Sequence, residues 1–243
     1  MKFKIEWFDK LASTNALMRE RFGQGSDIES GHIVAAHEQT AGRGRQDRKW
    51  LSTAGTNLCF SLFVQTKAEL MDVPALTMAA ALAVAEMLGR KNIDATLKWP
   101  NDVLVDGRKI CGILSERVER TSAPKTGIIV GIGLNVNMSS EEAGAIDRPA
   151  TSILIETGQA TDLSHTLDDL FPLLEYWIGE WEKGGFSSLR TAWTERTGSL
   201  GKPLTVHDGD IKKTGTLAGF GNHGELLLQT TDGIETIWAG DIS

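Results

Sequence analysis

The chain has 243 residues, of which 41% are hydrophobic and 23% charged, and its formal net charge is −7. This length allows one large core plus a small additional domain, and the acidic balance argues against broad nucleic-acid binding. No segment approaches 18 uninterrupted apolar residues, and the first residues lack the apolar run of a signal peptide, so we expect a cytoplasmic protein without a membrane span. Cys59 and Cys111 lie in apolar runs without the spacing of a metal site or a disulfide framework.

The chain begins with an alternating segment, residues 3–8, that predicts a strand, followed by the entrance to a helix. Ser13, Thr14 and Asn15 at this entrance are all favourable N-cap residues. Capping needs only one of them, and three short polar side chains can also hydrogen-bond a small polar ligand. From these residues alone, both interpretations remain open.

Strands are predicted for residues 31–38 and 57–64, joined by a loop of about 18 residues, a length typical of functional or disordered loops. The segment Thr40–Trp50 (TAGRGRQDRKW) places four cations and two glycines in this loop. Guanidinium groups bind carboxylate or phosphate in a fixed geometry, and the glycines allow close backbone approach or positive φ. We expect the loop to be mobile until an anion orders it. Taken alone, the loop is most simply a solvated basic turn. A nucleic-acid tail of the Arg-Gly type is the other interpretation, but only one such unit occurs, and it lies between two predicted strands.

A buried helix is predicted to begin at Pro74, followed by a short strand at residues 95–98. Asp106-Gly107 then has the signature of a tight type I′ hairpin, which puts Lys109 near the turn, opposite Leu104 or Val105. Lys98 and Asp102 precede this turn, and an exposed, ion-paired hairpin is the simpler alternative to a binding site.

Two further strands are predicted, at residues 110–119 and 127–137. Gly131 and Gly133 in the second suggest that a ligand or another backbone approaches closely, because glycine otherwise weakens a strand. Residues 139–150 are acidic and irregular, and Thr151-Ser152 is typical of the N-cap of a short helix.

The remaining segments are helices at residues 163–183 and 189–196, and short strand-like runs at 203–207, 212–220, 226–229 and 235–239. The last four indicate a small β-barrel. We place the domain boundary near residue 196, with one domain at 1–196 and the other at 197–243.

Taken in order, these motifs resemble the biotin protein ligases, also called biotin–[acetyl-CoA-carboxylase] ligases. The resemblance covers roughly residues 7 to 157 and runs through Ser13-Thr14-Asn15, Gln39, Gly42-Arg43-Gly44-Arg45 to Trp50, Lys98-Trp99-Pro100-Asn101-Asp102, Arg108-Lys109 with Gly112-Ile113-Leu114, and Gly131-Ile132-Gly133-Leu134-Asn135. It implies an α/β (α+β) fold: a mixed-sheet catalytic domain with helices and a small C-terminal SH3-like β-barrel.

The resemblance also implies a two-step reaction. Biotin reacts with MgATP to give biotinyl-5′-AMP, and biotin then passes to one lysine of a biotin carboxyl carrier protein of acetyl-CoA carboxylase or a related carboxylase. Mg²⁺ would be carried by ATP rather than by a separate metal site. Some family members carry an N-terminal DNA-binding domain, and this chain begins almost directly at the catalytic domain, so we expect no operator binding and no repressor function.

The resemblance implies catalytic roles for Lys109 and Arg45, both near the biotin carboxylate and the α-phosphate. It favours ligand binding over simple capping for Ser13, Thr14 and Asn15, and it implies two sets of contacts. The biotin-binding set is Ser13, Thr14, Asn15, Gln39, Arg43, Gly44, Arg45, Lys109 and Gly112, and the ATP-binding set is Arg48, Trp50, Lys98, Asn101, Asp102 and Asn135.

One departure concerns Gln46-Asp47, where some relatives carry Arg-Gly, which lowers the positive charge of the loop. The nearest rival function is a lipoate ligase, which shares the fold class and the acyl-adenylate chemistry. Two further candidates are a non-enzymatic module that senses biotin or binds nucleic acid, and a ligase that has lost its activity.

Overall fold

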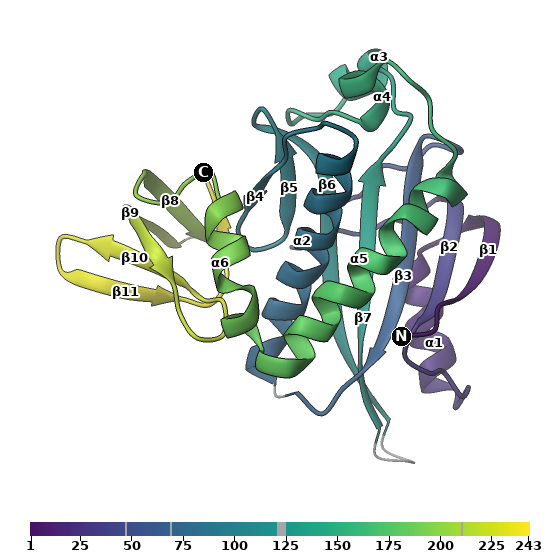
Figure 1. Ribbon diagram of the computed structural model, residues 1–243, viewed down its shortest axis with the longest axis horizontal. Coiled ribbons are helices and arrows are strands. Elements are labelled where there is room, and N and C mark those ends of the chain that lie inside the picture. The colour runs from purple at the N-terminus through teal and green to yellow at the C-terminus, as the bar shows by residue number, and fades with distance from the viewer. Residues whose placement is uncertain (47, 69, 121–124, 210) are drawn as a thin grey trace.

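The computed structural model describes residues 1–46, 48–68, 70–120, 125–209 and 211–243, and it contains two sheets with helices packed around them (Figure 1). The first sheet has the spatial order β1-β2-β3-β7-β6-β5-β4, in which only β1 and β2 pair in parallel, so the predicted mixed sheet is confirmed. Its strands are β1 Lys4–Leu11, β2 His32–Gln39, β3 Asn57–Gln65, β4 Thr96–Lys98, β5 Asp102–Val105, β6 Arg108–Arg120 and β7 Lys125–Asn135.

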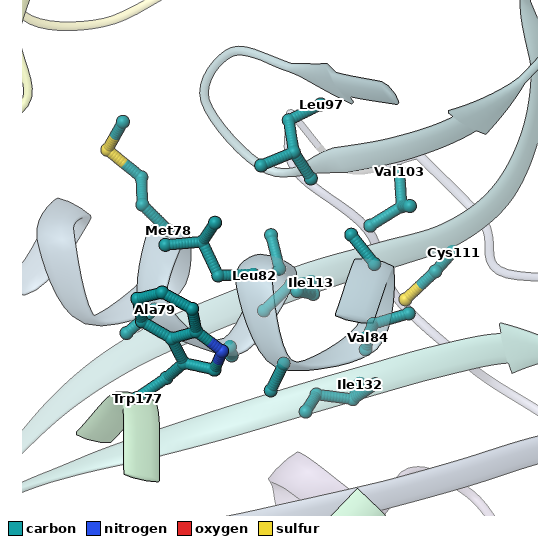
Figure 2. Packing of buried hydrophobic residues seen from close by; sticks show 14 of the residues in the cluster. Met78, Ala79, Leu82, Val84, Leu97, Val103, Cys111, Ile113, Ile132 and Trp177 are labelled. Atoms are coloured by element: carbon teal, nitrogen blue, oxygen red, sulfur yellow. The ribbon is translucent and has the colours of Figure 1, made fainter. Parts of the chain in front are cut away.

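One face of this sheet is covered by α2 (Val73–Arg90), with α5 (Leu163–Gly184) alongside it (Figure 1). Alanine recurs along α2, so its backbone lies close to the strands, and nearly all of the helix is buried, as predicted. Figure 2 shows Leu82 of α2 beside Ile113 of β6, and both belong with Leu97 of β4 to one buried cluster. This apolar layer forms the main core.

The opposite face is covered in part by α1 (Thr14–Gly23), whose Met18 and Phe22 pack in a smaller cluster with Phe63 and Ile129. Both faces of β2 and β3 are therefore buried at their centres, as expected from their continuous apolar sequence.

The β5–β6 turn is the predicted hairpin. Asp106 and Gly107 both have positive φ, 48° and 75°, as a type I′ turn requires. Lys109 lies opposite Leu104 in the register, which confirms its predicted place near the turn.

The segment 139–150, which was predicted to be irregular, contains a short helix, α3 (Ser140–Gly144). Ser139 and Glu142 form a capping box, in which each side chain binds the backbone of the other. The other helical elements are η1 Leu70–Asp72, α4 Ile153–Thr157 and α6 Phe186–Arg196.

The second sheet is antiparallel, with the order β11-β10-β9-β8-β12. Its strands are β8 Pro203–Asp208, β9 Ile211–Phe220, β10 Leu226–Thr230, β11 Gly233–Ile237 and β12 Asp241–Ile242, of which β12 was not predicted. Phe220 contacts Phe186 and Trp193 of α6, and Trp99 Nε1 donates to Gly224 O at 2.9 Å, so the two sheets are joined. The SH3-like assignment and the boundary near residue 196 stay predictions.

Among the described residues, one helical stretch, Leu70–Arg90, is long and apolar enough by composition to cross a membrane. Within its most apolar window, 72% of the residues are buried inside the fold, as in the core helix of a globular protein.

We predict that Leu82→Ala lowers the free energy of unfolding by about 3–5 kcal/mol, because the side chain is fully buried in the main core and its loss leaves a cavity. Chemical denaturation measures this change. Arg90→Ala, at the exposed end of the same helix, is the control and should have little effect. Equal unfolding midpoints for both variants would show that α2 does not organise the core.

Candidate active site

On the face of the first sheet that carries α1, three glycines leave part of the surface without side chains. We call the surface over Gly112, Gly131 and Gly133 the glycine floor. An ideal Cβ added to Gly131 would lie 2.2 Å from Asn15 Oδ1, and one on Gly133 would lie 2.4 Å from Trp50 Cε2. On Gly112 it would lie 2.9 Å from Lys109 Nζ. Gly112 and Gly133 are opposite each other in the β6–β7 register. The predicted close approach at the β7 glycines is therefore made by side chains, from Asn15 of α1 and Trp50 of the basic loop, and not by another backbone. The predicted approach of a ligand stays a prediction.

Four polar side chains lie together at the α1 end of this floor and are called the polar wall below: Thr14, Asn15, Gln39 and Ser61. Thr14 N donates to Gln39 Oε1 at 2.8 Å, and Ser61 Oγ lies 2.7 Å from Thr14 Oγ1 and 2.5 Å from Asn15 Oδ1. Thr14, Asn15 and Ser61 are all buried. Three of the predicted biotin-binding residues are thus brought together. Ser61 was missed, although a lone serine in the apolar strand NLCFSLFV was a signal for it.

Ser13 precedes this wall and is the N-cap of α1, but its capping contact is long. The distance from Ala16 N to Ser13 Oγ is 3.5 Å, which is at the limit for a hydrogen bond. Capping therefore accounts for little of the hydrogen-bonding capacity of this buried hydroxyl.

The basic loop between β2 and β3 folds back on itself over the floor. Trp50 N donates to Gly42 O at 2.9 Å, and Gly44 N donates to Arg48 O at 2.7 Å. An ideal Cβ on Gly42 would lie 2.6 Å from Trp50 O, so glycine is required there, whereas Gly44 has no such crowding. Among the described residues of Thr40–Trp50, neither glycine has positive φ, whereas Gln46 does, at 53°. Asp47, the other half of the departure from relatives, lies outside the described residues.

Lys109 extends from the hairpin over the floor. Its Nζ is 2.6 Å from Asp102 Oδ1 and 5.8 Å from the ring centre of Trp50. The ion pair fits the simpler interpretation of the hairpin, but Lys109 is only one-third exposed and its ammonium lies over Gly112. Lys98 lies opposite Asp102 in the β4–β5 register, which keeps all three predicted charged residues close together.

The second sheet contributes to the site through the turn before β12. Arg45 Nη1 donates to Asn101 Oδ1 at 3.3 Å, to Gly240 O at 3.1 Å and to Asp241 Oδ1 at 3.0 Å. Arg48 forms an ion pair with the same Asp241. The sequence offered no signal for a contact that joins residues almost 200 positions apart.

Arg45 and Lys109 therefore meet at neighbouring residues, since Arg45 binds Asn101 and Lys109 binds Asp102. Asn101 is itself fixed, because its Nδ2 donates to Ile113 O at 2.8 Å. The two predicted catalytic cations thus flank one turn at the edge of the sheet.

Asn135 lies behind Lys109 rather than on the open side of the site. Asn57 Nδ2 donates to Asn135 Oδ1 at 2.7 Å, and Asn135 Nδ2 donates to Thr151 O at 2.9 Å and to Lys109 O at 3.4 Å. The side chain is buried, so in this structure it fixes the backbone that presents Lys109. Its predicted contact with ATP stays a prediction.

Neither cysteine is activated for chemistry. Cys59 lies opposite Gly133 in the β3–β7 register, and burial raises the pKa of its thiol. Burial also raises the pKa of Cys111 far above its ordinary value, so both behave as small apolar residues, as predicted. Within the described ranges, no group of three or more His, Cys, Asp or Glu side chains is arranged to hold a metal ion.

We predict that Gly133→Ala displaces Trp50 from the floor and speeds trypsin cleavage within the basic loop, because the added methyl group overlaps the indole. Thermal stability should change little, since the loop can move away from the sheet. Gly179→Ala, on α5 with open space around it, is the matched control. Identical cleavage of the two variants would show that Trp50 does not hold the loop down.

Comparison with known proteins shows which family the chain resembles in sequence and fold. Residues 7–135 match the model of the biotin/lipoate A/B protein ligase family. The chain is 33% identical to a biotin–[acetyl-CoA-carboxylase] ligase of Paracoccus denitrificans over 96% of this chain and 98% of that protein. It is 32% identical to the Mycobacterium tuberculosis enzyme of that name, over 95% of this chain and 85% of that protein.

A solved structure with the same fold is the biotin protein ligase of Aquifex aeolicus in complex with biotin and ATP. Its TM-score is 0.81 and its identity 30%, and the alignment covers 98% of this chain and 97% of that one. With the matched family model and these full-length similarities, the chain belongs to the biotin/lipoate A/B protein ligase family.

Proposed function

We propose that this chain is an ATP-dependent biotin protein ligase, which forms biotinyl-5′-AMP and transfers biotin to a lysine of a biotin carboxyl carrier domain. The observation that carries the proposal is the glycine floor with a neutral polar wall at one end and Lys109 at the other. Biotin has the matching chemistry, because its ureido ring is neutral and polar, its chain is apolar and its carboxylate is anionic.

The polar wall favours biotin over lipoate. Thr14, Asn15 and Ser61 are buried, and with Gln39 and Ser13 they offer hydroxyl and amide groups that the ureido ring can satisfy. The dithiolane ring of lipoate has no N–H or C=O, so it would forgo the hydrogen bonds that these groups can still make, above all those of Ser13, whose capping contact is long. A site of this kind discriminates strongly against an analogue that lacks the polar group.

The first chemical step brings together two anions, the biotin carboxylate and the α-phosphate of ATP. A carboxylate oxygen bonds to the α-phosphorus and the bond to pyrophosphate breaks, so negative charge leaves the carboxylate and gathers on the α-phosphoryl oxygens and on the departing pyrophosphate oxygen. Lys109 and Arg45 flank this region and can stabilise that charge. Arg48 and Lys98 add positive charge where the nucleotide phosphates would lie.

In the second step, the ε-amine of the acceptor lysine attacks the carbonyl carbon of biotinyl-5′-AMP, and AMP leaves with the bridging oxygen. The loop residues Arg43, Gly44 and Trp50 would cover the intermediate and keep water from it. Mg²⁺ prefers phosphate oxygens and water to a dedicated protein cage, so we propose that it arrives bound to ATP.

We also propose a cytoplasmic location, supported by two free, buried cysteines without a disulfide framework. The absence of operator binding stays a prediction, and a salt-dependent gel shift is its check.

Incubation with biotin, MgATP and a biotin carboxyl carrier domain should add the mass of one biotinyl group to one lysine of the carrier. Lipoate in place of biotin should give no product, for the reason given by the polar wall. Intact-mass spectrometry of the carrier measures both. A lipoyl product without a biotinyl product would overturn the proposal in favour of a lipoate ligase.

Lys109→Ala should fold normally and lower biotin-dependent ATP–pyrophosphate exchange about 100- to 1,000-fold, because it removes a cation at the developing charge. The control is Lys183→Ala at the exposed end of α5, which should retain wild-type exchange. Undiminished exchange in the Lys109 variant would refute the role of this residue.

A further inference from the structure

Glu116 of β6 lies beside the polar wall and joins three parts of the site that are remote in sequence. Its Oε2 accepts a hydrogen bond from Asn15 Nδ2 at 2.7 Å. Its Oε1 forms an ion pair with Arg19 of α1 and lies 3.8 Å from Arg43 Nη2 in the basic loop. The side chain is 24% exposed, so this carboxylate is partly shielded from water.

The contact with Asn15 determines how the polar wall is oriented. A carboxylate only accepts hydrogen bonds, so the Nδ2 group of Asn15 must face Glu116 and its Oδ1 must face Ser61. Leu114 O accepts a second bond from the same Nδ2 at 3.3 Å. Because Asn15 is buried, a reversed amide would put two acceptors face to face at a cost that water could not relieve.

The contact with Arg43 reaches the basic loop. Arg43 is 45% exposed, and a single ion pair at that exposure contributes little stability by itself. Closure of the loop over a ligand would exclude water from the pair and strengthen the attraction. Glu116 is thus placed to favour the closed loop when the pocket beside Asn15 is filled.

We propose that Glu116 is a positioning residue for biotin: it orients Asn15 in the head-group pocket and couples that pocket to closure of the loop through Arg43. The inference rests on the proposed biotin ligase function. Glu116 does not contact the reacting carboxylate or phosphate, so its loss affects capture of biotin rather than use of ATP.

The test compares E116A, E116Q and E116D with wild type and with E119A, which removes an exposed carboxylate from the same strand. Biotin-dependent ATP–pyrophosphate exchange gives KM for biotin, KM for ATP and kcat, and thermal unfolding reports the fold. E116A should raise KM for biotin about tenfold or more, the effect of leaving a buried amide without its charged partner. KM for ATP should stay at the wild-type value, E116D should recover part of the loss, and E119A should match wild type.

A double-mutant cycle separates the two contacts. E116Q keeps an acceptor for Asn15 but loses the charge that attracts Arg43, so E116Q combined with R43A should be no worse than R43A alone. Biotin should also protect the loop from trypsin less well in E116Q than in wild type.

An unchanged KM for biotin in folded E116A, or equal increases in KM for biotin and ATP, would overturn the inference. Fully additive effects of E116Q and R43A on KM for biotin would overturn the proposed coupling between Glu116 and the loop through Arg43. If E116A does not fold, E116Q and E116D decide by the same measurements. Failure of the wild type to exchange with biotin would instead reject the proposed function.

Discussion

Successive side chains of a strand point to opposite faces of a sheet, and this alternation allows one sheet to serve as both core and site. On one face, residues such as Ile113 and Ile132 pack under α2 and exclude water. On the other face, the adjacent positions Gly112 and Gly133 present only backbone. A methyl group at either glycine would enter space now held by Lys109 or Trp50. The site exists because the strands are packed on one side and bare on the other.

The second constraint is charge balance. The repulsion among the cations around the floor is reduced, because carboxylates from separate strands form ion pairs with them. Asp102 of β5 pairs with Lys109, and Asp241 of β12 pairs with the loop arginines. An incoming phosphate must therefore compete with carboxylates for the same cations. This competition lets the protein hold a strongly positive site within an acidic chain without a large unpaired positive surface.

Much of this architecture could be predicted from local sequence. The Asp106-Gly107 turn follows from residues that tolerate positive φ, and the buried helix after Pro74 from its apolar composition. Positions matched by family resemblance, such as Thr14 and Gln39, lie together as that resemblance implied. The short α3 was missed, although its capping box was visible in the sequence.

The contacts that could not be predicted are those that depend on tertiary packing. Asp241 reaches Arg45 only because the second sheet folds back against the first, and nothing near either residue indicates the other. Ser61 and Glu116 resemble ordinary strand residues until the register places them beside α1. Asn135 is a different case. Its motif predicts a contact with ATP, which stays a prediction, whereas in the structure its hydrogen bonds support the backbone of Lys109.

One strand, β6, carries both ends of the proposed pocket: the Lys109 ammonium lies over Gly112, and Glu116 follows four residues later. The repeat of an extended backbone places Gly112 and Glu116 about 13 Å apart along the strand. The strand therefore sets the distance between the two ends of the pocket, to within the reach of the two side chains. An acid whose tail differs by one methylene would have to be accommodated by the flexible side chain of Lys109, because the strand itself cannot stretch.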